Sequence, residues 1–161
     1  MESIVRAIEG TAINEWILSS AWLWPTLEIL HFLGLSLLIG SLLIIDLRLF
    51  GWFRQIQLSV VHKLLSMTFL GFALNLATGI LFVLGDPARY AANVGFRWKM
   101  FLILVAGVNA IWFFRRINPT MAEWDPHGDT SLATKVVAFV SLGAWTGVLL
   151  LGRLIPYIGT G

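Results

Sequence analysis

A histidine and a glutamate stand three residues apart near the start of the first long apolar stretch of the sequence. His31 lies about six residues beyond Pro25, roughly 9 Å along a helix, and Glu28 shares its helix face. Ionisable side chains are costly inside a membrane, so both are candidate functional groups. Gly34 follows one turn further along this face and would leave room for a bulky group.

Three other apolar stretches bring polar side chains toward the same half of the membrane. Lys99 and Arg97 lie at the start of the third stretch, and Arg153 lies about one turn before the end of the fourth. Asn75 lies deeper, in the second stretch. We therefore expect the four stretches to contribute to one polar cluster.

An imidazole beside cations in an apolar helix bundle suits a haem group. Haem iron binds a neutral histidine nitrogen, the porphyrin packs against apolar walls, and its propionates pair with Arg or Lys. We expect His31 to be the axial ligand, with Arg97, Lys99 and Arg153 as candidates for the propionates. Glu28 would fix the histidine tautomer, or pair with Lys99 or Arg153.

A purely structural interpretation stays open for the same residues. His31 and Glu28 would then only hydrogen-bond between helices, and Arg97 and Lys99 would extend toward lipid head groups. A second iron ligand is not evident, because His62 lies on the opposite side of the membrane, roughly 20 Å from His31. The iron would be five-coordinate, or held in a homodimer in which each subunit supplies His31.

The composition requires a membrane environment. Of the 161 residues, 58% are hydrophobic and only 12% are charged, about half the usual charged share, so lipid must cover much of the surface. No basic stretch is dense enough for nucleic acid. The lack of cysteine excludes disulfides, thiolate metal sites and iron–sulfur clusters.

The apolar runs predict an all-α integral membrane four-helix bundle in one domain, residues 1–161. A helix needs about 20 apolar residues to cross a bilayer, and four segments qualify, at about 25–46, 64–85, 96–114 and 132–156. The first twenty residues mix charged and apolar side chains. This mixture predicts a short amphipathic helix at the interface rather than a signal peptide.

Four spans place both termini on one side, the terminal side, and two connections on the other, the loop side. Six Lys and Arg residues fall on the loop side: Arg48, Arg54, Lys63, Arg115, Arg116 and Lys135. Arg6 and Arg89 fall on the terminal side, once the three cations of the cluster are set aside. The loop side is therefore predicted to be cytoplasmic, with periplasmic termini, in the inner membrane of a bacterium.

Other polar or small residues on the loop side and in the spans are interpreted as structural. Asp46 and Arg48 are expected to pair, to tie down the short turn after the first span, or to act in topology. The loop residues Glu123, Asp125, His127 and Asp129 match no metal-ligand spacing. Two small-residue pairs, Ser36 with Gly40 and Gly143 with Gly147, predict close helix approach, within the subunit or in a dimer.

The sequence resembles a family of small bacterial four-helix membrane proteins whose activity is uncharacterised. The resemblance rests on the run Trp24-Pro25-x-x-Glu28-x-x-His31-x-x-Gly34, on Gly40 and on Asp46-Leu47-Arg48-Leu49-Phe50-Gly51. It continues through Gly71-Phe72-x-x-Asn75-x-x-Thr78-Gly79, Phe96-x-x-Lys99 and Asn109.

More distantly, the first-span histidine and the arginine closing that span are similar to two other groups. These are the copper-resistance D-type membrane domains and the HemJ-type protoporphyrinogen oxidases, which bind haem b. The resemblance implies His31 as a haem ligand. The histidine-rich pattern of the HemJ-type enzymes is incomplete in this chain.

We therefore expect a b-type haem protein that passes electrons between a quinone or a membrane dehydrogenase and a periplasmic redox protein. One alternative is a porphyrinogen oxidase-like enzyme that acts at the same pocket, so the question of enzymatic activity stays open. A copper-handling component is another, although Cu(I) prefers thiolate and thioether ligands. A structural membrane subunit is the third.

Overall fold

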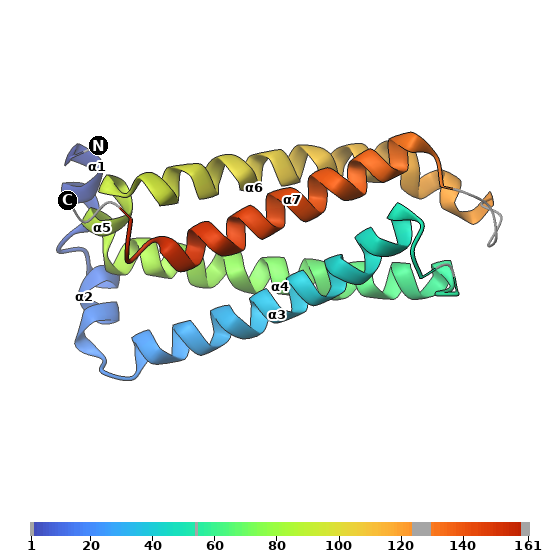
Figure 1. The fold of residues 1–161 in the computed structure, drawn as a ribbon. Helices are drawn as coiled ribbons and strands as arrows, with labels where there is room; N and C mark the ends of the chain where they lie inside the picture. The colour runs from blue at the N-terminus through green and yellow to red at the C-terminus, as the bar shows by residue number, and fades with distance from the viewer. Residues whose placement is uncertain (1, 54, 124–129, 159–161) are drawn as a thin grey trace.

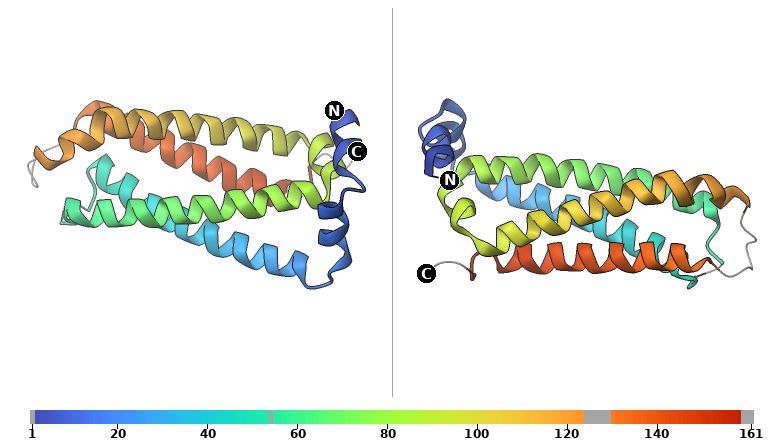
Figure 2. Two further views of the ribbon diagram at one scale, coloured as in Figure 1. Left: turned by 180° about the vertical axis from the view of Figure 1, so that it is seen from behind. Right: turned by 90° about the horizontal axis from the view of Figure 1, so that it is seen from above.

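The computed structural model describes residues 2–53, 55–123 and 130–158, and all regular secondary structure in these ranges is helical. Four helices are long: α3 (Leu23–Phe50), α4 (Leu58–Gly85), α6 (Val94–Trp112) and α7 (Leu132–Leu154). All four are long and apolar enough to cross a membrane. They run along one common direction, with both termini at the same end (Figures 1 and 2). The predicted multi-pass four-helix bundle is thus confirmed.

Residues that interrupt a helix determine where two of the long helices end. Gly51 has a left-handed φ of 103°, and the amides of Gly51 and Trp52 donate to the carbonyls of Arg48 and Leu47 at the end of α3. α4 ends at Gly85, as the following Asp86-Pro87 predicts.

Two of the long helices are longer than the predicted spans. α3 and α4 extend into the loop side by several residues, because a helix continues through polar interfacial residues that an apolar run does not include.

The last part of the third span departs from α-helical geometry. α6 continues through a π-helical turn, η1 (Phe113–Ile117), into a 3-10 segment, η2 (Asn118–Glu123). Phe113 and Ile117 are buried there, together with Ile45 and Leu49 of α3 and Val137 of α7. The main apolar core therefore lies on the loop side, where the long helices converge. Toward the termini α3 diverges from α7 (Figure 1).

The N-terminal segment forms two short helices rather than the single one predicted. Gly10, with a φ of 74°, separates α1 (Glu2–Ile8) from α2 (Ala12–Ser19). A left-handed φ is easily adopted by glycine, which has no Cβ to clash. α2 lies across the end of the bundle, with Trp16 exposed (Figure 1).

Two buried side chains fix α2 against the end of α4. Asn14 donates from Nδ2 to the carbonyl of Leu84, at 2.7 Å. Ile17 is buried, and a Cβ at Gly85 would lie 2.9 Å from its Cγ2. The α2 helix thus satisfies a carbonyl at the end of α4 that has no partner within its own helix.

Helices α3 and α4 cross at a pair of glycines, Gly34 and Gly71. A Cβ at Gly71 would lie 2.6 Å from the amide nitrogen of Leu38 and 2.7 Å from the carbonyl oxygen of Gly34. Only glycine permits this approach of two backbones. The predicted pair Ser36 and Gly40 is exposed instead, and a Cβ at Gly40 would meet nothing within 4 Å.

Helices α6 and α7 are joined by two asparagines. Asn93, which is buried, accepts from the amide of Phe96 and caps α6. Its Nδ2 donates to the carbonyls of Ile155, at 2.8 Å, and Ile158. At the other end, Asn109 donates to the carbonyl of Val137.

Candidate functional site

His31 turns toward α4 and not toward lipid. Its Nδ1 lies 2.7 Å from Oγ1 of Thr78, and its ring meets the ring of Phe82 edge-on at 5.4 Å between centroids. Thr78 is buried, whereas the imidazole is half-buried. The histidine is therefore positioned by the same α3–α4 interface that the two glycines bring together.

The hydrogen bonds around Thr78 determine the tautomer of His31. The Thr78 hydroxyl lies 2.7 Å from the carbonyl oxygen of Leu74, one turn earlier, and donates its only proton there. It must then accept from Nδ1–H of the imidazole, which leaves the lone pair on Nε2. Among the described residues Nε2 has no hydrogen-bond partner. This nitrogen is therefore available to a metal or to another donor.

Lys99 brings a positive charge close to this imidazole from α6. Its side chain runs over Gly152 of α7, where a Cβ would lie 3.3 Å from Nζ. The ammonium is close enough to act electrostatically on His31. Lys99 is half-buried, and within the described ranges it forms no ion pair or hydrogen bond. His31 on α3 and Lys99 on α6 thus lie in the same half of the bundle, with His31 packed on α4 and Lys99 beside α7.

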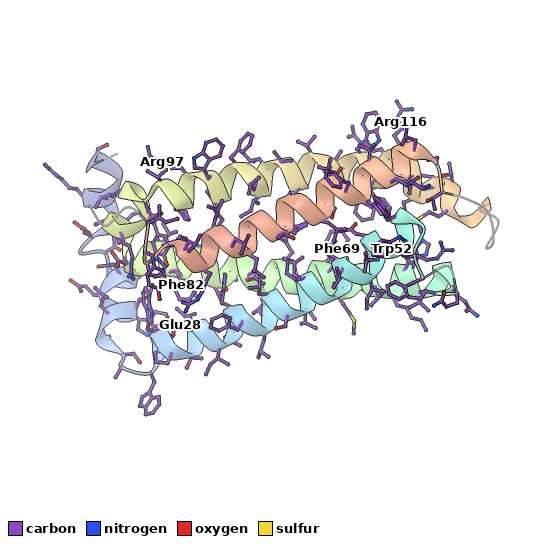
Figure 3. All side chains as sticks on the ribbon, viewed as in Figure 1. Glu28, Trp52, Phe69, Phe82, Arg97 and Arg116 are labelled. Carbon is purple, nitrogen blue, oxygen red and sulfur yellow. The ribbon has the colours of Figure 1, made fainter. Side chains whose placement is uncertain are left out.

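The two arginines of the predicted cluster lie at the surface. Arg97 is exposed on the outer side of α6, away from Glu28 and Phe82 (Figure 3). Arg153 is also exposed, with its guanidinium carbon 5.8 Å from the centre of the Tyr157 ring. Of the three predicted cations, Lys99 is the one turned inward.

Glu28 does not contact His31 through a hydrogen bond. Its carboxylate accepts from the indole nitrogen of Trp24, at 3.2 Å, on an exposed part of α3. Thr78 instead holds the Nδ1 side of His31. The sequence signal for Thr78 was its place three residues after Asn75 on α4, which puts both on one helix face.

Gly34 and Asn75 belong to the crossing of α3 and α4. The expectation that Gly34 leaves room for a bulky group is wrong, because a Cβ there would lie 2.6 Å from Nδ2 of Asn75 and 3.1 Å from the carbonyl oxygen of Gly71. Asn75 donates from Nδ2 to this carbonyl, at 2.9 Å. Close packing of α4 thus fills the space beside Gly34.

Asp46 and Arg48 do not form the expected pair. Arg48 is buried and donates from Nε to the carbonyl of Ile56, at 3.0 Å, so it does tie down the turn after α3. Asp46 is also buried and hydrogen-bonds Ser141 of α7. Its second oxygen, Oδ2, has no hydrogen-bond partner.

A protein-bound metal ion needs several converging ligands, and no group of three or more His, Asp or Glu side chains gathers in the described part of the chain. The side chains of Glu123, Asp125, His127 and Asp129 lie outside the described residues.

Comparison with known proteins gives no relative from which a role could be transferred. No family model, curated protein or solved structure matches the chain. Fold and site together define a multi-pass α-helical membrane protein with an inward-facing histidine and an inward-facing lysine in one half of its spans.

Proposed function

We propose that the protein is a b-type haem protein of the bacterial inner membrane that transfers electrons, with His31 as an axial ligand of the haem iron. The observation that supports this most directly is the hydrogen bond between Nδ1 of His31 and Thr78, which leaves Nε2 with a free lone pair.

The donor chemistry at His31 fits the iron. A histidine ligand binds metal through one ring nitrogen, while the other donates to an acceptor that fixes its orientation. The Thr78 hydroxyl is that acceptor, and Phe82 restrains the ring from a second side. Haem iron receives four nitrogens from the porphyrin, so one or two protein ligands suffice.

The charges near His31 fit the propionates. Lys99 offers a half-buried ammonium without a partner in the described ranges, in the same half of the bundle as His31. Arg153 is the next-to-last residue of α7, at its terminal-side end, where a second propionate would reach water. Arg97, on the outer side of α6, is not needed for this arrangement.

The chain would hold and orient the group, while the haem would supply one-electron chemistry when bound. Thr78 keeps the proton on Nδ1, so that Nε2 stays a neutral donor atom. The Lys99 charge offsets a negative propionate in a region of low polarity. The Lys and Arg distribution supports a position near the periplasm, with electrons passing between a quinone or membrane dehydrogenase and a periplasmic redox protein.

The test is the haem content of purified protein and of two histidine variants. The wild-type chain, purified in detergent, should show a Soret band that sharpens on dithionite reduction. His31→Ala should lower haem per chain at least tenfold, since loss of a ligand costs more than the roughly 10- to 100-fold effect of removing a group that only orients the ligand. His62→Ala is the matched control, because His62 is exposed near the other end of the bundle, and it should keep its haem.

Two controls make the result decisive. Unchanged helical circular dichroism and elution volume would show that His31→Ala is folded, and added imidazole should restore part of its haem binding. A colourless wild-type protein, or a His31→Ala variant with full haem content, would refute the proposal.

A further inference from the structure

A second candidate site lies on the loop side, in a groove between α4 and α6. In the part of the chain that the structure describes, α3 packs against α4 and α7, and α7 packs against α6, whereas α4 and α6 are not closely packed against each other. A cavity of about 340 Å³ lies among these four helices. Phe69 of α4 and Ile111 of α6 both line it and are more than half exposed, at 56% and 55%. The cavity therefore opens sideways, between α4 and α6, toward lipid.

The cavity is about as long as one leaflet of a bilayer. Its lining residues run from Leu38 to Leu49 on α3, and from Ile103 on α6 to Phe114 on η1. Each of these stretches rises by roughly 16 Å along its helix, which is about half of the roughly 30 Å hydrocarbon core. Leu49 and Phe114 lie at the loop side, so the cavity extends from that side to about the middle of the membrane.

The polar side chains of the cavity are engaged within the protein or are inaccessible. Thr68 and Asn109 donate to backbone carbonyls, and Ser141 hydrogen-bonds Asp46. Oδ2 of Asp46 has essentially no accessible surface. The other lining residues are apolar or glycine. The walls therefore favour hydrocarbon over water, because a buried water needs two to four polar partners.

A lipid acyl chain has the properties that this cavity requires. It is apolar, it is as long as one leaflet, and it reaches the opening by lateral motion in the bilayer. An empty cavity would leave its walls without dispersion contacts. A helix of another protein is about 10 Å wide, and it does not fit, because the stacked rings of Phe69 and Phe114, with centroids 5.5 Å apart, join α4 to η1 across the groove.

Two arginines follow the cavity at its loop-side end. Arg115 comes directly after the lining residue Phe114 and about one helical turn after Ile111. Arg116 is next, in the half of the bundle away from the termini (Figure 3). Both side chains are exposed, and neither forms an ion pair within the described ranges. Asp46 is the one acidic side chain that the structure describes on this side, and it is buried. This end of the cavity thus carries positive charge at the level of lipid head groups.

We infer that the cavity binds one acyl chain of an anionic phospholipid from the loop-side leaflet, and that Arg115 and Arg116 bind its head group. A guanidinium binds phosphate oxygens through two parallel hydrogen bonds, and basic sites between membrane helices bind anionic head groups in other proteins. The inference goes beyond the proposed haem site and does not rest on it, because the cavity and both arginines lie toward the other end of the bundle from His31.

Native mass spectrometry of the full chain in detergent tests the head-group contact. The probes are dioleoyl phosphatidylglycerol, which is anionic, and dioleoyl phosphatidylcholine, which has the same chains but is zwitterionic. The wild type should bind one phosphatidylglycerol at least about fivefold more tightly, the effect of one basic residue near a membrane surface. Arg115→Gln combined with Arg116→Gln should remove this preference. Arg97→Gln is the control, because Arg97 is an equally exposed arginine at the other end of α6. Equal affinity of the wild type for the two lipids, or an equal loss of preference in Arg97→Gln, would overturn the inference.

A further variant tests the position of the acyl chain. Gly107 lines the cavity, and a Cβ there would meet nothing within 4 Å, so Gly107→Phe should occupy the space and weaken phosphatidylglycerol binding at least about fivefold. Gly143→Phe is its control, because Gly143 is equally uncrowded but does not line the cavity. Normal lipid affinity in Gly107→Phe would refute the site. A protein dimer in the same spectra that Gly107→Phe abolishes would assign the groove to a second copy of the chain, and would also overturn the inference. The arginine variants change only exposed side chains, so they test the inference even if Gly107→Phe fails to fold.

Discussion

Replacing Gly71 by alanine should force α3 and α4 apart at the point where their backbones cross. The new Cβ would lie 2.6 Å from the amide nitrogen of Leu38 and 2.7 Å from the carbonyl oxygen of Gly34. Both are backbone atoms, so no side-chain rotation relieves the contact. The helices must separate by about 0.8 Å to reach ordinary van der Waals distance.

The expected cost follows from the packing that is lost. Overpacking of this kind destabilises proteins by about 1–3 kcal/mol, and a gap of 0.5–1 Å loses a quarter to a half of each affected dispersion contact. For a chain of this length, 1 kcal/mol shifts the unfolding midpoint by roughly 2–4 °C. We therefore expect Gly71→Ala to lower the midpoint by about 4–10 °C.

Gly79→Ala is the matched control on the same helix. A Cβ at Gly79 would meet nothing within 4 Å, so the substitution should only add helix propensity, worth about 0.5–1 kcal/mol. Thermal unfolding in one detergent, followed by circular dichroism, compares the two variants directly. The proposed glycine crossing is wrong if Gly71→Ala is as stable as Gly79→Ala.

Two further substitutions test contacts on which the site depends. Asn93→Ala should lower the free energy of unfolding by about 2–4 kcal/mol, since it removes the cap to Phe96 and the buried bond to Ile155; an unchanged denaturation midpoint would show that this bond contributes nothing. Thr78→Val should weaken haem binding by roughly 10- to 100-fold, because Thr78 orients the ligand. It should also raise the midpoint potential of the haem that stays bound by about 20–65 mV, because His31 loses the acceptor that makes it a stronger donor. Thr78→Ser, which keeps the hydroxyl, should retain the wild-type potential in a redox titration, and equal potentials in all three proteins would contradict the assigned tautomer.

The depth of the polar groups could be predicted from the sequence, but the direction of several side chains could not. His31 and Lys99 lie in the same half of the bundle because the distance of a residue from the end of its span sets its level in the membrane. Arg97 shares the depth of Lys99 but lies on the outer side of α6. Residues two apart on a helix point in nearly opposite directions, so the sequence allowed only one of them to face His31, without indicating which.

The partners of the buried groups also required the structure. α3 is apolar around its whole circumference, so its sequence gives no single face that must meet a neighbour. Gly34 could therefore be interpreted as room for a ligand, although it lies against Gly71. Asp46 could be interpreted as half of an ion pair, although it lines a cavity beside Ser141.

The sequence by itself determined the class of protein, the number of spans and several of their ends. These follow from local properties, namely the length of apolar runs and the positions of residues such as Gly51 and Pro87 that interrupt a helix. The tertiary structure alone decided that Thr78 holds His31, that two glycines bring α3 and α4 together, and that Asp46 lines an apolar cavity among the four long helices. Such contacts depend on how each helix is rotated about its axis, and this rotation is set by side chains of other helices, far away in the chain.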